Sequence, residues 1–545
     1  MLVNDHWMLP TDSGGKPATK PPLYNWIAAP AVALLGHSSE FAHKLPSIIA
    51  LVASWMVVVW SGRWIDRWRG DLIGPLAGLM FVSCYAVSKL GYLARPDMLL
   101  TFFLLMGWAC ATRLLMMTPP PNTPAGQGEW MAERDQQAPP QIPRWPLLLA
   151  FWLSVGLAAL TKGPPAILLI AYALLGGWLL AGSWRSVGRF GWWWGLPLAL
   201  AIPGAWLAAA ISVDLAHVRD VLWHEEIAGR ITGEGPEGGS DGLAGIVTDV
   251  LHYPFYFIAR FAPWSIATVL AIADLILVGL SAWRNGAERL PPAFNATRSA
   301  MEYPRPLLTV LKTRRDRLRA TLGERGVLLF AGVLMIAIAI ALFSLSSGKR
   351  ADYIALVYGP GAILAAWWAA MRPPFLAVRA KWAIPVIAVL VIIGIGVNNE
   401  LEPPAPVRGF GDAQSDFAAH VHDVLRDDPR PVAVIWQAPG PVPALAGLAT
   451  TIDNGDLPRL LKGDEPFYVL AGRRNAEPHD WGMYMAERRP ELRIEVAARS
   501  AVLPRERGFP TQMSLFRVDP AGGEASSRPQ SSHPPFVWQR VARQP

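Results

Sequence analysis

Four short segments of this sequence lie at the edges of apolar runs, and each contains at least one cation. Three of them also contain an aspartate, a tyrosine or both. They read Lys20-Pro-Pro-Leu-Tyr24-Asn-Trp, Leu-Ala-Arg95-Pro-Asp97, Leu-Thr-Lys162-Gly-Pro and Ser-Ser-Gly-Lys349-Arg350-Ala-Asp-Tyr353. Arginine and lysine are the usual phosphate-binding side chains. An aspartate at a membrane–water boundary can orient a hydroxyl group, accept its proton or help to hold a cation. Together the segments indicate a site for an anionic ligand.

Some of these residues also have a purely structural interpretation. Lys20 could extend toward lipid headgroups, and Asp97 could cap the helix that begins beside Pro96. A further loop holds Trp223-His224-Glu225-Glu226 and Arg230. A histidine such as His224 is, taken alone, more often a polar surface residue than a catalyst. The functional interpretation depends on whether all these segments meet on one side of a membrane.

The composition indicates that membrane-spanning helices must position these segments. Of the 545 residues, 52% are hydrophobic and only 17% are charged, and there are 25 tryptophans. Soluble domains have about 25% charged residues, and tryptophan favours the headgroup region of a bilayer. A span needs about 20 mostly apolar residues, and such runs lie at 45–64, 72–93, 97–116, 146–162, 166–182, 192–212, 256–280, 327–346, 353–371 and 382–398.

These ten runs should be helices because backbone groups in lipid must be hydrogen-bonded internally. The shorter stretch 22–36 contains two prolines and is typical of an interfacial helix. Alternate loops are rich in arginine, as at Arg63, Arg67 and Arg69, and the positive-inside rule places them in the cytoplasm. The candidate segments then share the outer face. The net charge of +7 lies in these loops, which argues against nucleic-acid binding.

The chain changes character after residue 398. Residues 399–520 alternate β-type runs such as PVAVIW and LRIEVAA with helical stretches, which predicts a small extracytoplasmic α/β domain. Residues 521–545 are rich in Ser, Pro and Gln and are predicted to be disordered. The expected fold is an all-α polytopic membrane domain over residues 1–398, of about ten transmembrane helices, followed by this α/β domain.

Other common chemistries have no signature here. Cys84 and Cys110 lie within apolar runs and are interpreted as packing residues. The sequence has no cysteine–histidine metal motif, phosphate-binding loop or Rossmann glycine pattern. No cofactor and no metal site are expected; a divalent cation is possible, but no motif indicates one.

The segments KPPLYNW, LARPDM, LTKGP, APWS and SLSSGKRADY occur in one order over residues 1–375. This order resembles the dolichyl-phosphate-mannose protein mannosyltransferase superfamily, and in particular its ArnT-like branch of bacterial aminoarabinose lipid A transferases. The resemblance implies a GT-C-type glycosyltransferase of the bacterial inner membrane with a periplasmic C-terminal domain. Such enzymes move a sugar from a polyprenyl-phosphate donor to an envelope acceptor, which could be lipid A, another glycan or a protein.

The resemblance also implies roles for individual residues. Asp97 would be an acidic residue of the active site, and Lys20 would contact the donor phosphate. Glu226 lies about where lipid A transferases place a histidine, and Arg230 matches the arginine of a loop that closes over the site. The predicted substrate-binding residues are Lys20, Tyr24, Arg95, Lys162, Glu226, Arg230, Lys349, Arg350 and Tyr353.

The start of the sequence departs from the family pattern. Family members begin with a transmembrane helix and an acidic D-E-x-x-Y segment that holds the usual catalytic aspartate. Here MLVNDHWMLP resembles the stretch just after that segment, Asp5 falls at the wrong place in it, and Thr19 replaces an often acidic residue. One more span and an acid are therefore expected upstream of Met1. Two alternatives stay open: an inactive truncated relative that binds polyprenyl lipid, or a lipid or solute transporter, although no internal repeat of the transporter type is present.

Overall fold

The structure is a computed structural model. It describes residues 6–10, 18–35, 39–65, 72–117, 143–180, 184–220, 243–285, 307–344, 350–370, 385–390, 409–434, 451–452, 465–473, 489–500 and 512–520, with a few single residues between them. The chain divides into two compact units, one of residues 19–24 and 46–393 and one of residues 1–18, 25–45 and 394–545. The predicted boundary at residue 398 and the predicted tail 521–545 lie outside the described residues.

Six described helical segments are long and apolar enough to cross a membrane. They belong to α2 (Glu40–Gly62), α5 (Pro96–Met116), α7 (Arg144–Lys162), α10 (Trp192–Val213), the second half of α15 (Leu307–Ser344), and η5 (Ala351–Val357) continued by α16 (Tyr358–Ala370). These segments match six of the ten predicted apolar runs. The pair α3 (Ile73–Val82) and α4 (Tyr85–Tyr92) makes a seventh if it is one span bent by 65°. The protein is thus a multi-pass membrane protein.

The remaining predicted runs differ from straight spans. The run 166–182 forms the short helix α8 (Ile167–Leu179), which η2 (Pro164–Ala166) precedes. The run 256–280 is divided between α13 (Leu243–Arg260) and α14 (Trp264–Asn285). Most of the run 382–398 lies outside the described residues. The predicted interfacial stretch 22–36 is the helix α1 (Leu23–Leu35), with Pro30 inside it.

The break between α3 and α4 is supported by side chains from the α13–α14 connection. Trp264 Nε1 donates to Ser83 Oγ over 2.9 Å, and Cys84 Sγ donates to the carbonyl oxygen of Arg260 over 3.2 Å. Polar groups at an interrupted helix must find such partners within the protein, because lipid offers none. The two breaks therefore lie against each other and hold the end of α13, with Arg260, in place.

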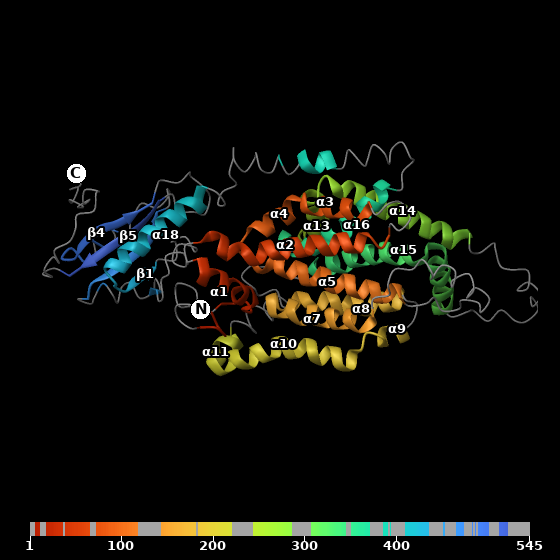
Figure 1. Ribbon diagram of the computed structural model, residues 1–545, viewed down its shortest axis with the longest axis horizontal. Helices are drawn as coiled ribbons and strands as arrows, with labels where there is room; N and C mark the ends of the chain where they lie inside the picture. Colours follow the sequence, from red (N-terminus) through yellow and green to blue (C-terminus); the bar gives the residue numbers. More distant parts are fainter. Residues whose placement is uncertain are drawn as a thin grey trace, which may run out of the picture. The chain divides into compact units, whose positions relative to one another are not determined.

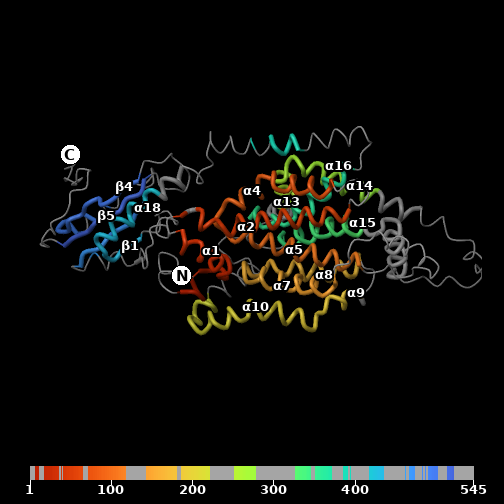
Figure 2. The backbone as a smooth tube through the Cα atoms, viewed as in Figure 1, coloured from red at the N-terminus to blue at the C-terminus, as the bar shows by residue number. Residues whose placement is uncertain are grey.

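Helix α5 lies at the centre of the larger unit. It packs against α7, α8, α15 and η5, and 78% of its most apolar stretch is buried (Figure 1). Figure 2 shows α5 and α7 running side by side, with α10 on the far side of α7. Only 17% of the corresponding stretch of α10 is buried, as expected for a helix that faces lipid. The first residues of α5, which include Asp97, are therefore placed by several neighbouring elements.

The C-terminal region forms the predicted α/β structure. Its five strands are β1 (Val432–Val434), β2 (Thr451–Ile452), β3 (Phe467–Arg473), β4 (Arg493–Arg499) and β5 (Gln512–Asp519), in the order β2-β1-β3-β5-β4. β1 pairs in parallel with β2 and β3, and β5 pairs antiparallel with β3 and β4. Successive strand residues face opposite sides. Leu470 and Leu515 pack with Phe417 of α18 (Gly409–Asp427), and Val469 and Phe516 form a second apolar cluster.

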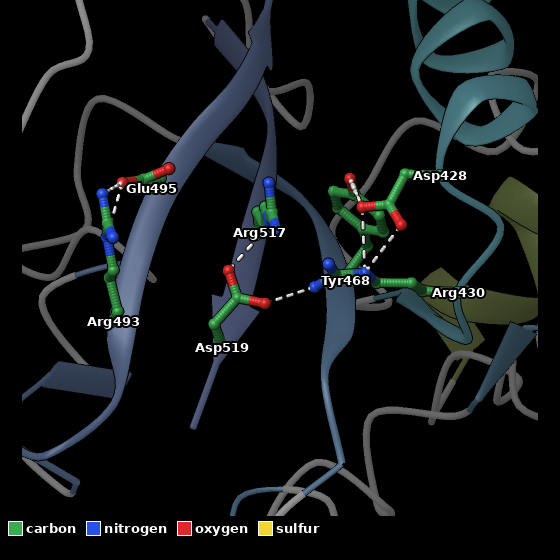
Figure 3. A network of polar contacts seen from close by, with 7 residues as sticks. All are labelled: Asp428, Arg430, Tyr468, Arg493, Glu495, Arg517 and Asp519. Carbon is green, nitrogen blue, oxygen red and sulfur yellow. Dashed lines mark hydrogen bonds and ion pairs between the residues drawn. The ribbon is translucent and has the colours of Figure 1, made fainter. Parts of the chain in front are cut away.

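A network of charges links the end of α18 to β3 and β5 (Figure 3). Arg430 donates to Asp428 over 3.0 Å and to Asp519, and its side chain is only 13% exposed. Tyr468 donates a 2.9 Å hydrogen bond to Asp428. Burial, followed by this hydrogen bond, raises the pKa of Tyr468 to about 12. Arg517 pairs with Asp519 at 2.8 Å. Arg430 thus joins two carboxylates that belong to different elements.

We expect Arg430→Gln to destabilise the smaller unit by about 2 kcal/mol, because hydrogen bonds to charged groups contribute about that much. Arg493→Gln is the matched control, since Arg493 pairs with Glu495 on the same sheet but is 64% exposed, and exposed ion pairs contribute under about 1 kcal/mol. Limited proteolysis of the full chain in urea would compare the two variants. Equal susceptibility of both variants would contradict a structural role for Arg430.

Candidate functional site

Asp97 stands in the first turn of the central helix α5. Pro96 is the first helical residue and Arg95, in an extended conformation, is the cap. The Asp97 carbonyl accepts a 2.8 Å hydrogen bond from Thr101 Oγ1, which fixes the turn. The cap makes no side-chain hydrogen bond to the helix. The cap position thus belongs to Arg95, and the Asp97 carboxylate accepts a hydrogen bond from another helix.

The partner of the Asp97 carboxylate is Lys162, which is 65 residues later in the sequence. Lys162 is the last residue of α7, and Gly163 ends this helix in a left-handed conformation with φ of 74° that favours glycine. Lys162 Nζ donates to Asp97 Oδ1, and both side chains are 10% exposed. Nζ also lies 4.4 Å from the ring centre of Tyr353, within the range of a cation–π interaction. Three predicted residues thus form one cluster, in which Asp97 is buried and Lys162 and Tyr353 are partly buried.

A second ion cluster uses the residue next to Tyr353. Asp352 Oδ1 accepts a 3.1 Å hydrogen bond from Arg260 Nη1, and Asp352 Oδ2 lies 3.8 Å from Arg95 Nη1. The Asp352 side chain is 17% exposed, that of Arg260 28% and that of Arg95 55%. The Arg260 guanidinium also lies 5.1 Å from the ring centre of Tyr256. Three chain segments therefore meet at one carboxylate.

A hydroxyl relay connects Tyr24 to the turn before α5. Tyr24 Oη and Ser47 Oγ are 3.0 Å apart, and Ser47 Oγ donates to the carbonyl oxygens of Leu93 and Arg95 over 2.7 and 3.1 Å. Tyr24 is buried, with 7% of its surface exposed. Its side chain therefore joins the segment that begins at Lys20 to the Arg95 turn. This geometry places the Tyr24 hydroxyl against Ser47 and the Arg95 turn, and its substrate contact stays a prediction.

The structure brings together five of the predicted residues: Tyr24, Arg95, Asp97, Lys162 and Tyr353. Lys20 is partly exposed four residues before Tyr24, and Arg350 is exposed just before η5. Glu226, Arg230 and Lys349 lie outside the described residues. Among the residues that the structure describes, no group of three His, Cys, Asp or Glu side chains could hold a metal ion.

Three residues of the site were missed as candidates: Ser47, Arg260 and Asp352. Arg260 lies in the predicted apolar run 256–280, and a charged residue in such a run is a functional candidate by default. Asp352 lies within a quoted segment, but its carboxylate was not singled out. Ser47 has no sequence signal, because a serine near a helix start is common. The two ion clusters together contain three cations and two carboxylates. Their net charge is therefore positive, which suits an anionic ligand.

The chain is similar to known proteins in sequence over its N-terminal part and in fold over most of its length. The profile of the family described as dolichyl-phosphate-mannose-protein mannosyltransferase matches residues 11–218. The solved structure of ArnT from Cupriavidus metallidurans bound to undecaprenyl phosphate is similar, with a TM-score of 0.55 and 17% identity, over 94% of this chain and 90% of that one. The apo structure of the same protein gives a TM-score of 0.54 and 16% identity, over 94% of this chain and 89% of that one. The family profile thus matches the N-terminal part of the chain, and the two solved structures show that the chain shares their fold.

A curated protein of known activity is similar to part of the chain. It is an undecaprenyl phosphate-alpha-4-amino-4-deoxy-L-arabinose arabinosyl transferase of Enterobacter sp. (strain 638), 23% identical over 227 residues, or 41% of this chain. The match spans 35% of the length of that relative. Tyr24, Asp97 and Lys162 lie within the part that the family profile matches, whereas Arg260 and Asp352 lie beyond it. The fold class predicted from sequence, a GT-C-type helical domain with a small α/β domain, is confirmed.

Proposed function

We propose that this protein is a membrane glycosyltransferase that moves a sugar from a polyprenyl-phosphate donor to an acceptor of the cell envelope. The observation that carries this proposal is the cluster of Asp97, Lys162 and Tyr353, beside a carboxylate that holds two arginines. The family profile matches the part of the chain that contains Asp97 and Lys162. A relative of the same fold is described as bound to undecaprenyl phosphate. A polyprenyl phosphate ester offers the single anionic group that such a site suits.

The proposed reaction requires a carboxylate that acts as a general base and several cations. A hydroxyl oxygen of the acceptor attacks the anomeric carbon, and Asp97 orients this hydroxyl and accepts its proton. The bond from the anomeric carbon to the phosphate oxygen breaks, and the lipid phosphate leaves with the electron pair. Lys162 and the arginines stabilise the negative charge as it grows. No cofactor is required in this scheme, because the donor already carries its leaving group.

The proposal also specifies the membrane and the side of it on which transfer occurs. The arginine-rich loops predict that the site and the C-terminal domain face the periplasm of a bacterial inner membrane. Lipid A or lipopolysaccharide, another glycan and protein are the candidate acceptors. An alkaline phosphatase fusion after residue 398 should be active. An inactive fusion would place Asp97 on the cytoplasmic side and exclude this acceptor class.

The decisive experiment uses the full chain, with any upstream segment that its gene encodes, purified in lipid nanodiscs. Undecaprenyl phosphate should bind tightly, and undecaprenol, which lacks the phosphate, should not. Membranes that contain radiolabelled lipid-linked sugar should transfer the label to an envelope fraction only when the protein is present. Binding without transfer would identify a catalytically silent lipid-binding relative. Equal binding of both lipids would exclude a polyprenyl-phosphate donor.

A further inference from the structure

The Asp352 carboxylate contacts two arginines, Arg260 and Arg95, and its contact with Arg260 is the shorter one. Arg260 is held on several sides: it donates to Asp352 over 3.1 Å, lies over the Tyr256 ring, and its backbone carbonyl accepts the Cys84 thiol. Arg95 lies 3.8 Å from Asp352 with 55% of its side chain exposed. An exposed ion pair at this distance contributes little free energy. Arg95 can therefore exchange Asp352 for another anion, whereas Arg260 stays in place.

The position of Asp352 connects this exchange to the site. The next residue, Tyr353, lies over Lys162, which pairs with Asp97. The backbone carbonyl of Arg95 is fixed by Ser47, so the side chain can move while the turn does not. A phosphate beside Lys162 and Tyr353 would therefore compete with Asp352 for the Arg95 guanidinium. Arginine binds phosphate by two parallel hydrogen bonds, which the 3.8 Å contact with Asp352 does not provide.

The chemistry of transfer makes this competition important. The donor is a phosphodiester with one negative charge. Transfer converts it to a phosphomonoester, whose second ionisation has a pKa of about 6 and which therefore has close to two negative charges at pH 7. A site with an excess of cations binds this product more tightly than the donor. The electrostatics that assist departure of the lipid phosphate thus also slow its release.

We infer that Asp352 is a positioning residue that promotes release of the lipid phosphate product by competing with it for Arg95. The inference rests on the proposed function. During transfer Arg95 moves to the phosphate, and afterwards Asp352 takes it back, which lowers the positive charge around the product. Asp352 is thus a built-in counter-ion that limits product inhibition, and it does not touch the sugar.

Binding of undecaprenyl phosphate to the full chain in nanodiscs tests this inference without turnover. Asp352→Asn should bind this lipid about tenfold more tightly than wild type, because one unit of opposing charge is removed at close range. Its affinity should also depend more steeply on salt concentration. Binding of uncharged undecaprenol should not change. Asp352→Glu, which keeps the charge, should behave as wild type, and adding Arg95→Gln to Asp352→Asn should remove most of the gain.

The outcomes separate this inference from the proposed function. If wild type distinguishes undecaprenyl phosphate from undecaprenol but Asp352→Asn binds the phosphate equally or more weakly, the inference is wrong and the proposed function stands. If wild type does not distinguish the two lipids, the proposed function itself fails. Should Asp352→Asn not fold, Arg95→Gln alone decides: it should weaken phosphate binding about tenfold, and unchanged binding would show that Arg95 does not exchange.

Discussion

Replacing Asp97 by asparagine should reduce sugar transfer by about 100-fold or more, because a positioned acid or base contributes at least that factor. Asparagine keeps the size of the side chain but can neither accept the proton nor balance the charge of Lys162. The carboxylate is 10% exposed and is held by α5, at the centre of the helical unit. The initial rate of label transfer from the lipid-linked sugar would measure the loss, with the binding of undecaprenyl phosphate measured in parallel. We expect binding to survive, since the cations remain.

Two further variants make the Asp97 result specific. Asp220→Asn is the matched control, because Asp220 also pairs with a cation, Arg219, but is 54% exposed and far from α5 in sequence. The Asp220→Asn variant should transfer sugar at the wild-type rate. Lys162→Gln tests the pair. If Lys162 acts by holding Asp97, the double variant Asp97→Asn/Lys162→Gln should be no slower than Asp97→Asn alone. An Asp97→Asn variant with more than half of the wild-type rate would remove Asp97 from the catalytic machinery.

The sequence predicted the candidate segments better than it predicted their pairing. Residue type and the positive-inside pattern predicted that Tyr24, Arg95, Asp97, Lys162 and Tyr353 share one face. The structure shows these residues linked by hydrogen bonds and ion pairs. The Asp97–Lys162 pair depends on how α5 and α7 pack, and hydropathy contains no information on which helix neighbours which. The roles of Tyr24 and Arg260 also depend on partners that are distant in sequence: Ser47 for one and Asp352 for the other.

The same limit applies to the helices. Runs such as 97–116 and 192–212 were predicted almost to the residue, because a straight span needs only length and apolar composition. The run 72–93 has the same composition but is bent by 65° after Val82. The bend is stabilised by Trp264 and the carbonyl of Arg260, which a window of neighbouring residues does not include. Average hydropathy therefore locates apolar runs, but it does not distinguish a straight span from a broken one.

Among the glycines of the described helices, Gly195 is the one at which an added methyl group should destabilise the fold most. A Cβ atom at Gly195 would lie 1.9 Å from Trp152 Nε1. Trp152 is fully buried, its Nε1 donates a 2.7 Å hydrogen bond to the carbonyl of Phe190, and its ring packs edge-on against Trp192. The ring therefore cannot move without loss of these contacts. Overpacking of this kind costs about 3 kcal/mol, and small residues are what allow membrane helices to approach closely.

The melting temperature of the detergent-purified protein, followed by fluorescence-detected size exclusion, would measure this loss. Gly204→Ala is a close control, because Gly204 lies in the same helix α10 and a Cβ there meets nothing within 4 Å. Both changes alter helix propensity equally, so a lower melting temperature for Gly195→Ala alone reports the contact between α7 and α10. Trp152→Leu should partly rescue Gly195→Ala by vacating the space beside the new methyl group. Equal melting temperatures for the two alanine variants would mean that α10 does not pack on α7 through Gly195. Other contacts would then hold α10 against the helical unit.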